Sequence, residues 1–231
     1  MKMPPCRRRT NRRFVLEREG CEPLVRAAIK VPPFGGRKEV EMQVGIRLHD
    51  TKALPLPQRL AETRAQGFSC AHVALGKVIE DFPINNGTLT PGFAMYLRKL
   101  FAANDLDIAV LGCYLNLANP NQKQLEEAIA TYKAQIRFAS LLGAGVVGTE
   151  TGTPNEQYAI DPNSRTEEAL TTFTRNLDRV VEYAEHMGVI VAIEPVIRHI
   201  VYDVHRARKV LDAIQSPHLQ IILDPVNLLD K

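Results

Sequence analysis

Two apolar runs of the chain end in the same way, with a carboxylate followed by proline. Glu194 ends one run and Asp224 ends the other. Continuous apolar runs are typical of parallel strands buried on both faces, and proline stops a strand because it cannot donate to the sheet. Carboxylates at the carboxyl ends of such strands lie at the rim where α/β barrels keep their chemistry. We therefore predict that Glu194 and Asp224 share one divalent-metal site, because hard cations prefer carboxylate oxygens.

Other polar side chains are expected at the same rim. Glu150 and His49 each end an earlier apolar run, and Arg198 and His199 follow Glu194 in a loop, where binding residues concentrate. We interpret all four as candidate substrate contacts.

Simpler roles remain open for several of these residues. Glu194 and Glu150 can form salt bridges with a neighbouring Lys or Arg side chain. Asp224 can cap the next turn, and His49 can be an ordinary rim histidine. We expect His72 to be a hydrogen-bonded interior histidine. The basic run on the last helix is expected to be solvated: His205, Arg206, Arg208 and Lys209.

The elements that position these residues alternate along the chain. Strand-like runs are predicted at residues 44–49, 68–75, 106–114, 146–150, 189–194 and 219–224. Helical patterns are predicted at residues 57–66, 91–103, 120–142, 165–187 and 203–214. Thr90 before Pro91 indicates a helix start, and Ser164 to Glu167 reads as a capping box. Gly67, Gly143 and Gly188 are expected to cap helix C-termini.

A repeated β-α order predicts a parallel sheet with right-handed crossovers. No glycine-rich phosphate-binding turn follows the first strand, which disfavours a dinucleotide-binding sheet. We therefore predict an α/β fold of the (β/α)8 TIM-barrel type. A closed barrel needs about 250 residues, so we expect an incomplete one with about six β-α units.

Composition limits the function classes. The formal net charge of the chain is +3, and the excess of basic residues lies in the first forty residues, so the rest is not interpreted as a nucleic-acid surface. No apolar run reaches the roughly 20 residues of a membrane helix. Four scattered cysteines fit free thiols in a reducing cytoplasm. Residues 1–41 lack periodicity and are predicted to be a disordered or extraneous extension, and residues 42–231 a partial TIM-barrel domain.

Four stretches, in their order and spacing, resemble the sugar phosphate isomerase/epimerase family of xylose-isomerase-like TIM barrels. They are residues 109–114, 142–147, 191–196 and 222–227. The family includes ketose 3-epimerases, inositol-pathway enzymes and, more distantly, AP endonucleases. The resemblance implies a small-molecule sugar as the substrate. It also implies one divalent cation, Mn²⁺ or Mg²⁺, held by side chains from four strand ends.

By this resemblance Glu194 is the first metal ligand and Asp224 the second. The third and fourth, a His and a Glu on two further strands, are not reached by this chain. Glu194 is also one member of the acid–base pair that moves a proton beside the ketone, through an enediolate that the cation stabilises. Asn227 stands where epimerases tend to carry a histidine, and it can still hydrogen-bond a sugar hydroxyl.

Two other functions remain open. The chain can be a non-catalytic fragment or incomplete gene product of such a barrel, in which the cation is weakly held or absent. It can also be an AP endonuclease-like enzyme, although the nearly neutral body and the few rim histidines argue against nucleic acid as a partner. Exposed sheet edges invite association, so a homo-oligomer is also left open.

Overall fold

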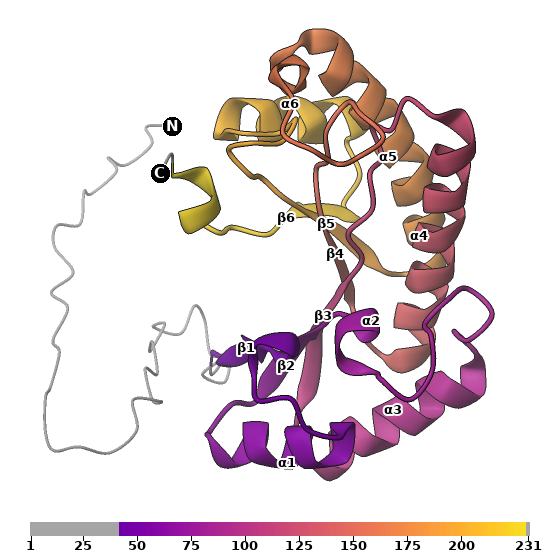
Figure 1. Ribbon diagram of the computed structural model, residues 1–231, viewed down its shortest axis with the longest axis vertical. Helices are drawn as coiled ribbons and strands as arrows, with labels where there is room; N and C mark the ends of the chain where they lie inside the picture. Colours follow the sequence, from indigo (N-terminus) through magenta and orange to yellow (C-terminus); the bar gives the residue numbers. More distant parts are fainter. Residues whose placement is uncertain (1–41, 230–231) are drawn as a thin grey trace, which may run out of the picture.

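The computed structural model describes residues 42–229, and the prediction for residues 1–41 lies outside them. The strands β1 to β6 form one sheet in sequence order (Figure 1). Every neighbouring pair is parallel. The predicted α/β architecture of TIM-barrel type with six strands is confirmed. The strands are Gly45–Arg47, Cys70–Val73, Asp107–Gly112, Val146–Glu150, Ile190–Glu194 and Leu219–Ile221.

The helices follow the strands and cover the outer face of the curved sheet. In Figure 1, α3, α4 and α5 lie side by side along this face, with α1 and α6 at its two ends. They are α1 Leu56–Ala65, α2 Leu75–Val78, α3 Pro91–Ala103, α4 Gln122–Leu142, α5 Glu167–Met187 and α6 Val204–Ile214.

Alternation along the strands separates the two faces of the sheet. Thr149 points outward, because its hydroxyl bonds the hydroxyl of Tyr132 on α4. Gly148 faces inward: a Cβ on it would lie 2.7 Å from Val110 Cγ1 and 2.8 Å from Ile222 Cδ1. Glu150, two residues further on, therefore faces inward as well.

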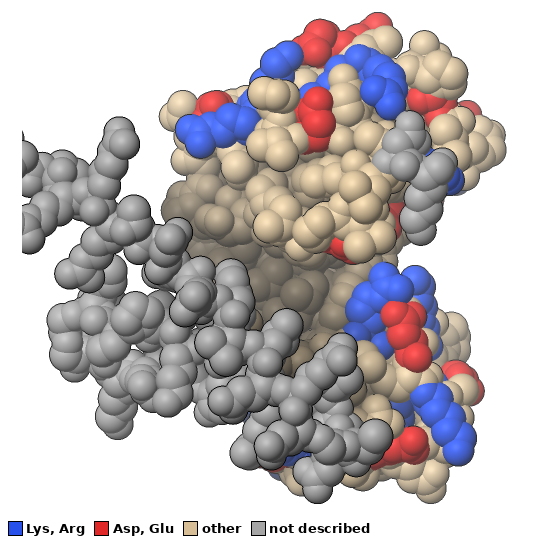
Figure 2. Space-filling view, turned by 90° about the vertical axis from the view of Figure 1, so that its left-hand side faces the viewer, with Lys and Arg blue, Asp and Glu red and all other residues tan. Residues whose placement is uncertain are grey.

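The hydrophobic core lies between the sheet and the outer helices. Tyr132, Phe138 and Phe173 are fully buried there against Val147 and Ile193. The inner side of the sheet is hollowed, and Figure 2 shows the surface receding between the upper and the lower part of the molecule. Inward-facing polar groups at the carboxyl ends of the strands therefore face a space that the other described residues leave open.

Helix boundaries follow the capping residues closely. The Thr90 hydroxyl accepts from Phe93 N, and Gly67, Gly143 and Gly188 have φ values of +92°, +86° and +65°. Two helices begin two residues later than predicted: α4 at Gln122, after the cap residue Asn121, and α5 at Glu167, because Thr166 rather than Ser164 caps it.

The other differences concern short elements. The first strand ends at Arg47, and residues 48–50 form a 3-10 turn that carries His49. The sixth strand stops at Ile221, three residues before Asp224. The four-residue helix α2 was not predicted, since one helical turn leaves no periodicity to detect.

One expectation about the last helix was wrong. Arg206 on α6 is only 4% exposed, whereas the sequence suggested a solvated side chain. Its guanidinium is satisfied by backbone carbonyls, which makes the buried charge tolerable. The carbonyls belong to Ser164, Arg165, Thr166 and Ile200. Arg206 therefore fastens the segment before α5 to the loop before α6.

Two further findings bear on the expected class of protein. None of the helices within residues 42–229 is long and apolar enough to cross a membrane. In the same part of the chain, Cys70 and Cys113 are buried free thiols, as expected. Cys6 and Cys21 lie outside the described residues.

Candidate functional site

Two carboxylates stand beside each other at the carboxyl ends of β4 and β5. Glu150 and Glu194 are register partners in the parallel ladder. Neighbouring strands lie about 4.8 Å apart, and register partners project from the same face. The charge of Glu150 contributes to raising the pKa of Glu194.

Glu194 has the more perturbed environment of the two. Burial is the main cause that raises its pKa, and the charges of Glu150 and Asp224 act in the same direction. A short hydrogen bond of 2.6 Å from Asn227 Nδ2 to Glu194 Oε1 opposes this effect. Glu194 is therefore an acid whose carboxylate is held in a fixed position and whose proton affinity is increased.

Asp224 lies near enough for its charge to act on Glu194, so both predicted ligands are at the same rim. Its Oδ1 accepts from Val226 N at 2.9 Å, which is the turn-capping role left open above. The two carboxylates offer oxygen donors suited to a hard cation, but only part of its usual shell of six or more ligands. Within residues 42–229, no group of three His, Cys, Asp or Glu is placed to hold a metal.

Glu150 has two aromatic neighbours. The Tyr158 hydroxyl donates to Glu150 Oε2 at 3.4 Å, and His199 Nδ1 lies 3.7 Å from the same oxygen. The two rings meet edge to face with centroids 5.4 Å apart. Burial raises the pKa of Tyr158, which keeps its hydroxyl protonated as a donor, and burial lowers the pKa of His199. Tyr158 was missed from the sequence, because a lone aromatic residue in a loop gives no signal of where it points.

The loops that carry these side chains brace one another. Val201 N donates to Thr151 Oγ1 at 3.1 Å, and Ile200 N donates to the Gly152 carbonyl at 3.1 Å. Ile197 N donates to the Asn227 carbonyl at 2.8 Å. The loops after β4, β5 and β6 are thus joined by hydrogen bonds, and the side chains on them are preorganised.

Two of the other candidates do not join this group. Arg198 is exposed, and its side chain makes no hydrogen bond or ion pair with any described residue. His49 directly follows β1, so it lies at the opposite edge of the sheet from β6. Its side chain is 12% exposed, and its ring centroid lies 5.9 Å from that of His72.

A second cluster therefore occupies the ends of β1 to β3. His72 Nε2 lies 2.8 Å from the Tyr114 hydroxyl, and both side chains pass over Gly112, where a Cβ would lie 2.6 Å from His72 Nε2. His72 is hydrogen-bonded, as expected, and burial lowers its pKa to about 4. The Lys77 ammonium lies 5.5 Å from the centroid of the Tyr114 ring.

The rim thus has two parts. We call Glu150, Glu194 and Asp224 the acidic half, and Arg47, His49, His72, Lys77 and Tyr114 the basic half. The Arg47 guanidinium lies within electrostatic reach of both halves. Asp50 is the main group that raises its pKa, and Tyr114 and Glu194 act in the same direction.

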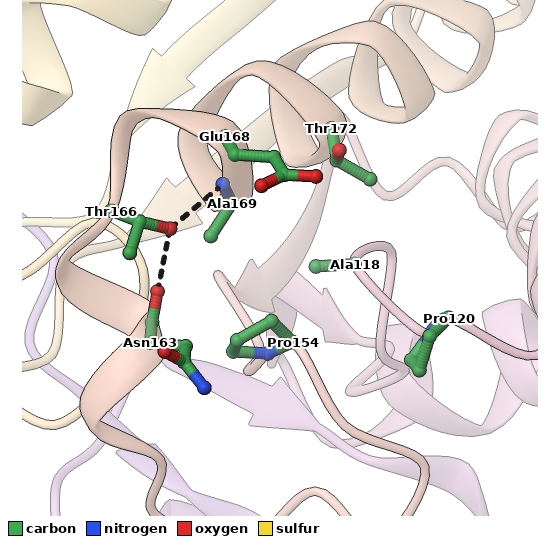
Figure 3. Close-up of a pocket in the computed structure, with 8 residues that line it drawn as sticks. All are labelled: Ala118, Pro120, Pro154, Asn163, Thr166, Glu168, Ala169 and Thr172. Atoms are coloured by element: carbon green, nitrogen blue, oxygen red, sulfur yellow. Dashed lines mark hydrogen bonds between the residues drawn. The ribbon is translucent and has the colours of Figure 1, made fainter.

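A separate hollow of about 370 Å³ lies beside the start of α5 (Figure 3). Thr166 lines it, but its hydroxyl is occupied by bonds to Ala169 N and the Asn163 carbonyl. Apart from Glu168, the lining side chains carry no charge: Ala118, Pro120, Pro154, Asn163, Thr166, Ala169 and Thr172. This hollow therefore lacks the paired acids found at the rim.

The sequence profile of the xylose isomerase-like TIM barrel matches residues 60–231. A comparison with curated proteins gave no match.

Several solved structures share the fold. One is a protein from Sinorhizobium meliloti 1021, 18% identical with a TM-score of 0.61, covering 80% of this chain and 64% of that one. Another is the IolI protein with a bound zinc atom, 18% identical with a TM-score of 0.62, covering 81% and 64%. A third is D-psicose 3-epimerase from Clostridium cellulolyticum H10 with D-tagatose, 13% identical with a TM-score of 0.63, covering 78% and 62%. The chain spans less than two thirds of each of these proteins.

Proposed function

This chain belongs to the xylose isomerase-like TIM barrel family, and on that premise we propose that its rim serves a sugar isomerase or epimerase reaction. The substrate is a small ketose or related sugar, and the reaction moves a proton at the carbon beside its carbonyl. The observation that carries the proposal is Glu194. It is a strand-end acid of raised pKa, held by Asn227 and placed in register with Glu150.

In this proposal Glu194 takes and returns the proton. Proton transfer is most efficient when the pKa of the catalytic group lies near the working pH, and burial moves the pKa of Glu194 in that direction. The amide of Asn227 engages Oε1, which leaves Oε2 to face the substrate.

The other polar groups of the acidic half have binding roles. Glu150, set by Tyr158 and His199, is suited to accept hydrogen bonds from sugar hydroxyls. Arg198, which is exposed in the loop after β5, is assigned to the substrate as well. Glu194 and Asp224 would hold a divalent cation, manganese or magnesium, which when bound supplies positive charge for oxygens that become negative in the reaction.

The number of acid–base groups decides between the two reaction types. One carboxylate can carry a proton between two neighbouring carbons on the same face, as aldose–ketose isomerisation requires. Inversion at a carbon needs a second group on the opposite face. Proton–deuterium exchange at the sugar carbon beside the carbonyl, followed by NMR in D₂O, distinguishes them, because exchange with inversion requires both groups.

Isothermal titration with Mn²⁺ tests the cation site. Two carboxylates should bind Mn²⁺ weakly, with a Kd on the order of 0.1–1 mM. Glu194→Gln and Asp224→Asn should each weaken binding at least tenfold, whereas Glu127→Gln, on the exposed face of α4, should leave it unchanged. Unaltered affinity in Glu194→Gln would remove this residue from the site.

A second candidate is a chain that binds a sugar without turning it over. It is favoured by the lack of a third metal-binding side chain within residues 42–229. Sugar binding together with no deuterium exchange in the presence of Mn²⁺ supports this candidate, and measurable exchange contradicts it.

A further inference from the structure

The basic half of the rim carries positive charge that nothing in the proposed chemistry uses. Arg47 and His72 are register partners at the ends of β1 and β2, so both project toward the inner side. The Lys77 ammonium lies over the Tyr114 ring, 5.5 Å from its centroid. The ring centroids of His49 and His72 lie 5.9 Å apart, and Lys77 and Arg47 act electrostatically on both rings, as does the Asp50 carboxylate with the opposite sign.

The charges around these two rings are not balanced. Arg47 is paired with Asp50 at 2.6 Å. Among the residues that the structure describes, no carboxylate lies within 4.0 Å of the Lys77 ammonium. Lys77 therefore carries uncompensated charge beside a pair of histidines.

Hydrogen-bonding capacity is also left over. His49 Nδ1 is buried and has no partner among the described residues. A buried polar atom without a partner costs free energy, and an oxygen-bearing ligand would relieve that cost once the His49 ring turns, because solvent does not reach Nδ1 in this structure. His72 is already held by Tyr114, and Gly112 leaves the room that these two side chains need.

The opposite half of the rim has the opposite sign. Glu150, Glu194 and Asp224 repel an anionic group, whereas Lys77 and Arg47 attract one. A substrate with a negative group at one end is therefore oriented by the rim, with that end at β1 to β3 and its neutral end at Glu194. Electrostatic complementarity of this kind gives orientation and specificity.

We propose that Arg47, Lys77 and His49 bind the anionic end of the substrate, a phosphate or a carboxylate, opposite the strand-end acids. The inference rests on the proposed function, because it assumes that the carbonyl end of the same molecule lies at Glu194. Arginine binds oxyanions through paired N–H donors and lysine binds them as a point charge. The substrate class is thus a keto sugar that carries a phosphate or a carboxylate group.

Binding of inorganic phosphate to the metal-free full chain tests the site, followed by ³¹P NMR at low ionic strength, where screening is weak. Wild type should bind saturably, and Lys77→Gln and Arg47→Gln should each weaken binding at least fivefold. Lys99→Gln, an exposed lysine on α3, should bind as wild type does. Equal affinities of Lys77→Gln and Lys99→Gln, or no saturable binding by wild type, overturn the proposal.

Titration with three sugars identifies the source of the negative charge. D-fructose 6-phosphate or 5-keto-D-gluconate should bind at least tenfold more tightly than D-fructose, and Lys77→Gln should lose this preference. The charged sugar that binds more tightly shows whether the site takes a phosphate or a carboxylate. Equal binding of all three sugars contradicts the proposal. None of these titrations needs a metal or turnover, so they can fail while Mn²⁺ binding at Glu194 succeeds, and the reverse outcome is equally distinguishable.

Discussion

The acidic and basic halves of the rim stand on three parallel strands each, yet they are held by different means. In the acidic half, the backbones of three loops hydrogen-bond one another, and Asn227 fixes Glu194 directly. In the basic half, Lys77 and Arg47 are exposed, and the contacts that hold the group are between side chains, Arg47 with Asp50 and His72 with Tyr114. With the roles proposed above, the chemistry sits where the backbone fixes the side chains, and recognition where long side chains reach toward solvent.

The largest expected effect comes from removing the buried arginine that ties the acidic half together. Arg206→Met leaves the carbonyls of Ser164, Ile200 and their neighbours without a donor. We expect a loss of about 3 kcal/mol in the free energy of unfolding, measured by urea denaturation. Arg208→Met, on the exposed side of α6, is the matched control and should leave the urea midpoint unchanged. Equal midpoints for the two variants would show that the loops do not depend on Arg206.

The next effect concerns the buried histidine of the basic half. Burial lowers the pKa of His72 from 6.5 to about 4, so the folded chain binds fewer protons than the unfolded chain between these values. Stability should therefore fall as the pH drops from about 6.5 to about 4, by about 2 kcal/mol after allowance for partial exposure. His72→Gln should reduce this slope in urea titrations at several pH values. Tyr114→Phe should keep it, because burial rather than the tyrosine contact is the main cause; a slope lost in Tyr114→Phe would contradict this.

A smaller effect is expected from filling the space beneath the acidic half. Gly148→Ala would place a Cβ 2.7 Å from Val110 Cγ1 and 2.8 Å from Ile222 Cδ1. We expect a cost of about 1.5 kcal/mol, since the neighbouring side chains must shift. Gly145 directly precedes the same strand, and a Cβ on it would meet nothing within 4 Å, so Gly145→Ala should be tolerated. The melting temperatures of the two variants, measured by thermal unfolding, test this. Equal melting temperatures would mean that Val110 and Ile222 do not pack closely against Gly148.

The smallest expected effect tests whether the acidic half gives up stability for function. Because burial raises the pKa of Glu194, the folded chain favours its protonated form. Stability from this group is therefore full at low pH and is lost as the pH rises from the unfolded value of about 4.5. Glu194→Gln should gain on the order of 0.5 kcal/mol at pH 7, with the Asn227 hydrogen bond retained through the amide oxygen. A loss of stability in the same urea assay would mean that the carboxylate is better stabilised than its burial implies.

The strands, the main helices and the two rim acids could be predicted from the sequence because each has a local signal. An apolar run that ends in Glu-Pro or Asp-Pro marks a strand, and at Glu194 also its last residue, whereas β6 stops before Asp224. Thr90 or Gly143 marks a helix boundary without reference to the rest of the chain.

The contacts that make the site specific have no such signal. Tyr158 reaches Glu150 and His72 meets Tyr114 only because separate loops and strands come together. Arg206 looked solvated because its neighbours on α6 are, and only the carbonyls of a distant segment explain its burial. Arg198 stays a prediction, since its loop position suggested a substrate contact and its exposed side chain makes no contact among the described residues that would test it.

Anomalous diffraction from crystals of the chain soaked in Mn²⁺ tests whether Glu194 and Asp224 share one cation. We predict one manganese peak at the acidic half, within about 2.0–2.6 Å of a carboxylate oxygen from both Glu194 and Asp224. A peak bound to only one of these residues, a peak elsewhere on the molecule, or no peak at saturating Mn²⁺ would contradict it.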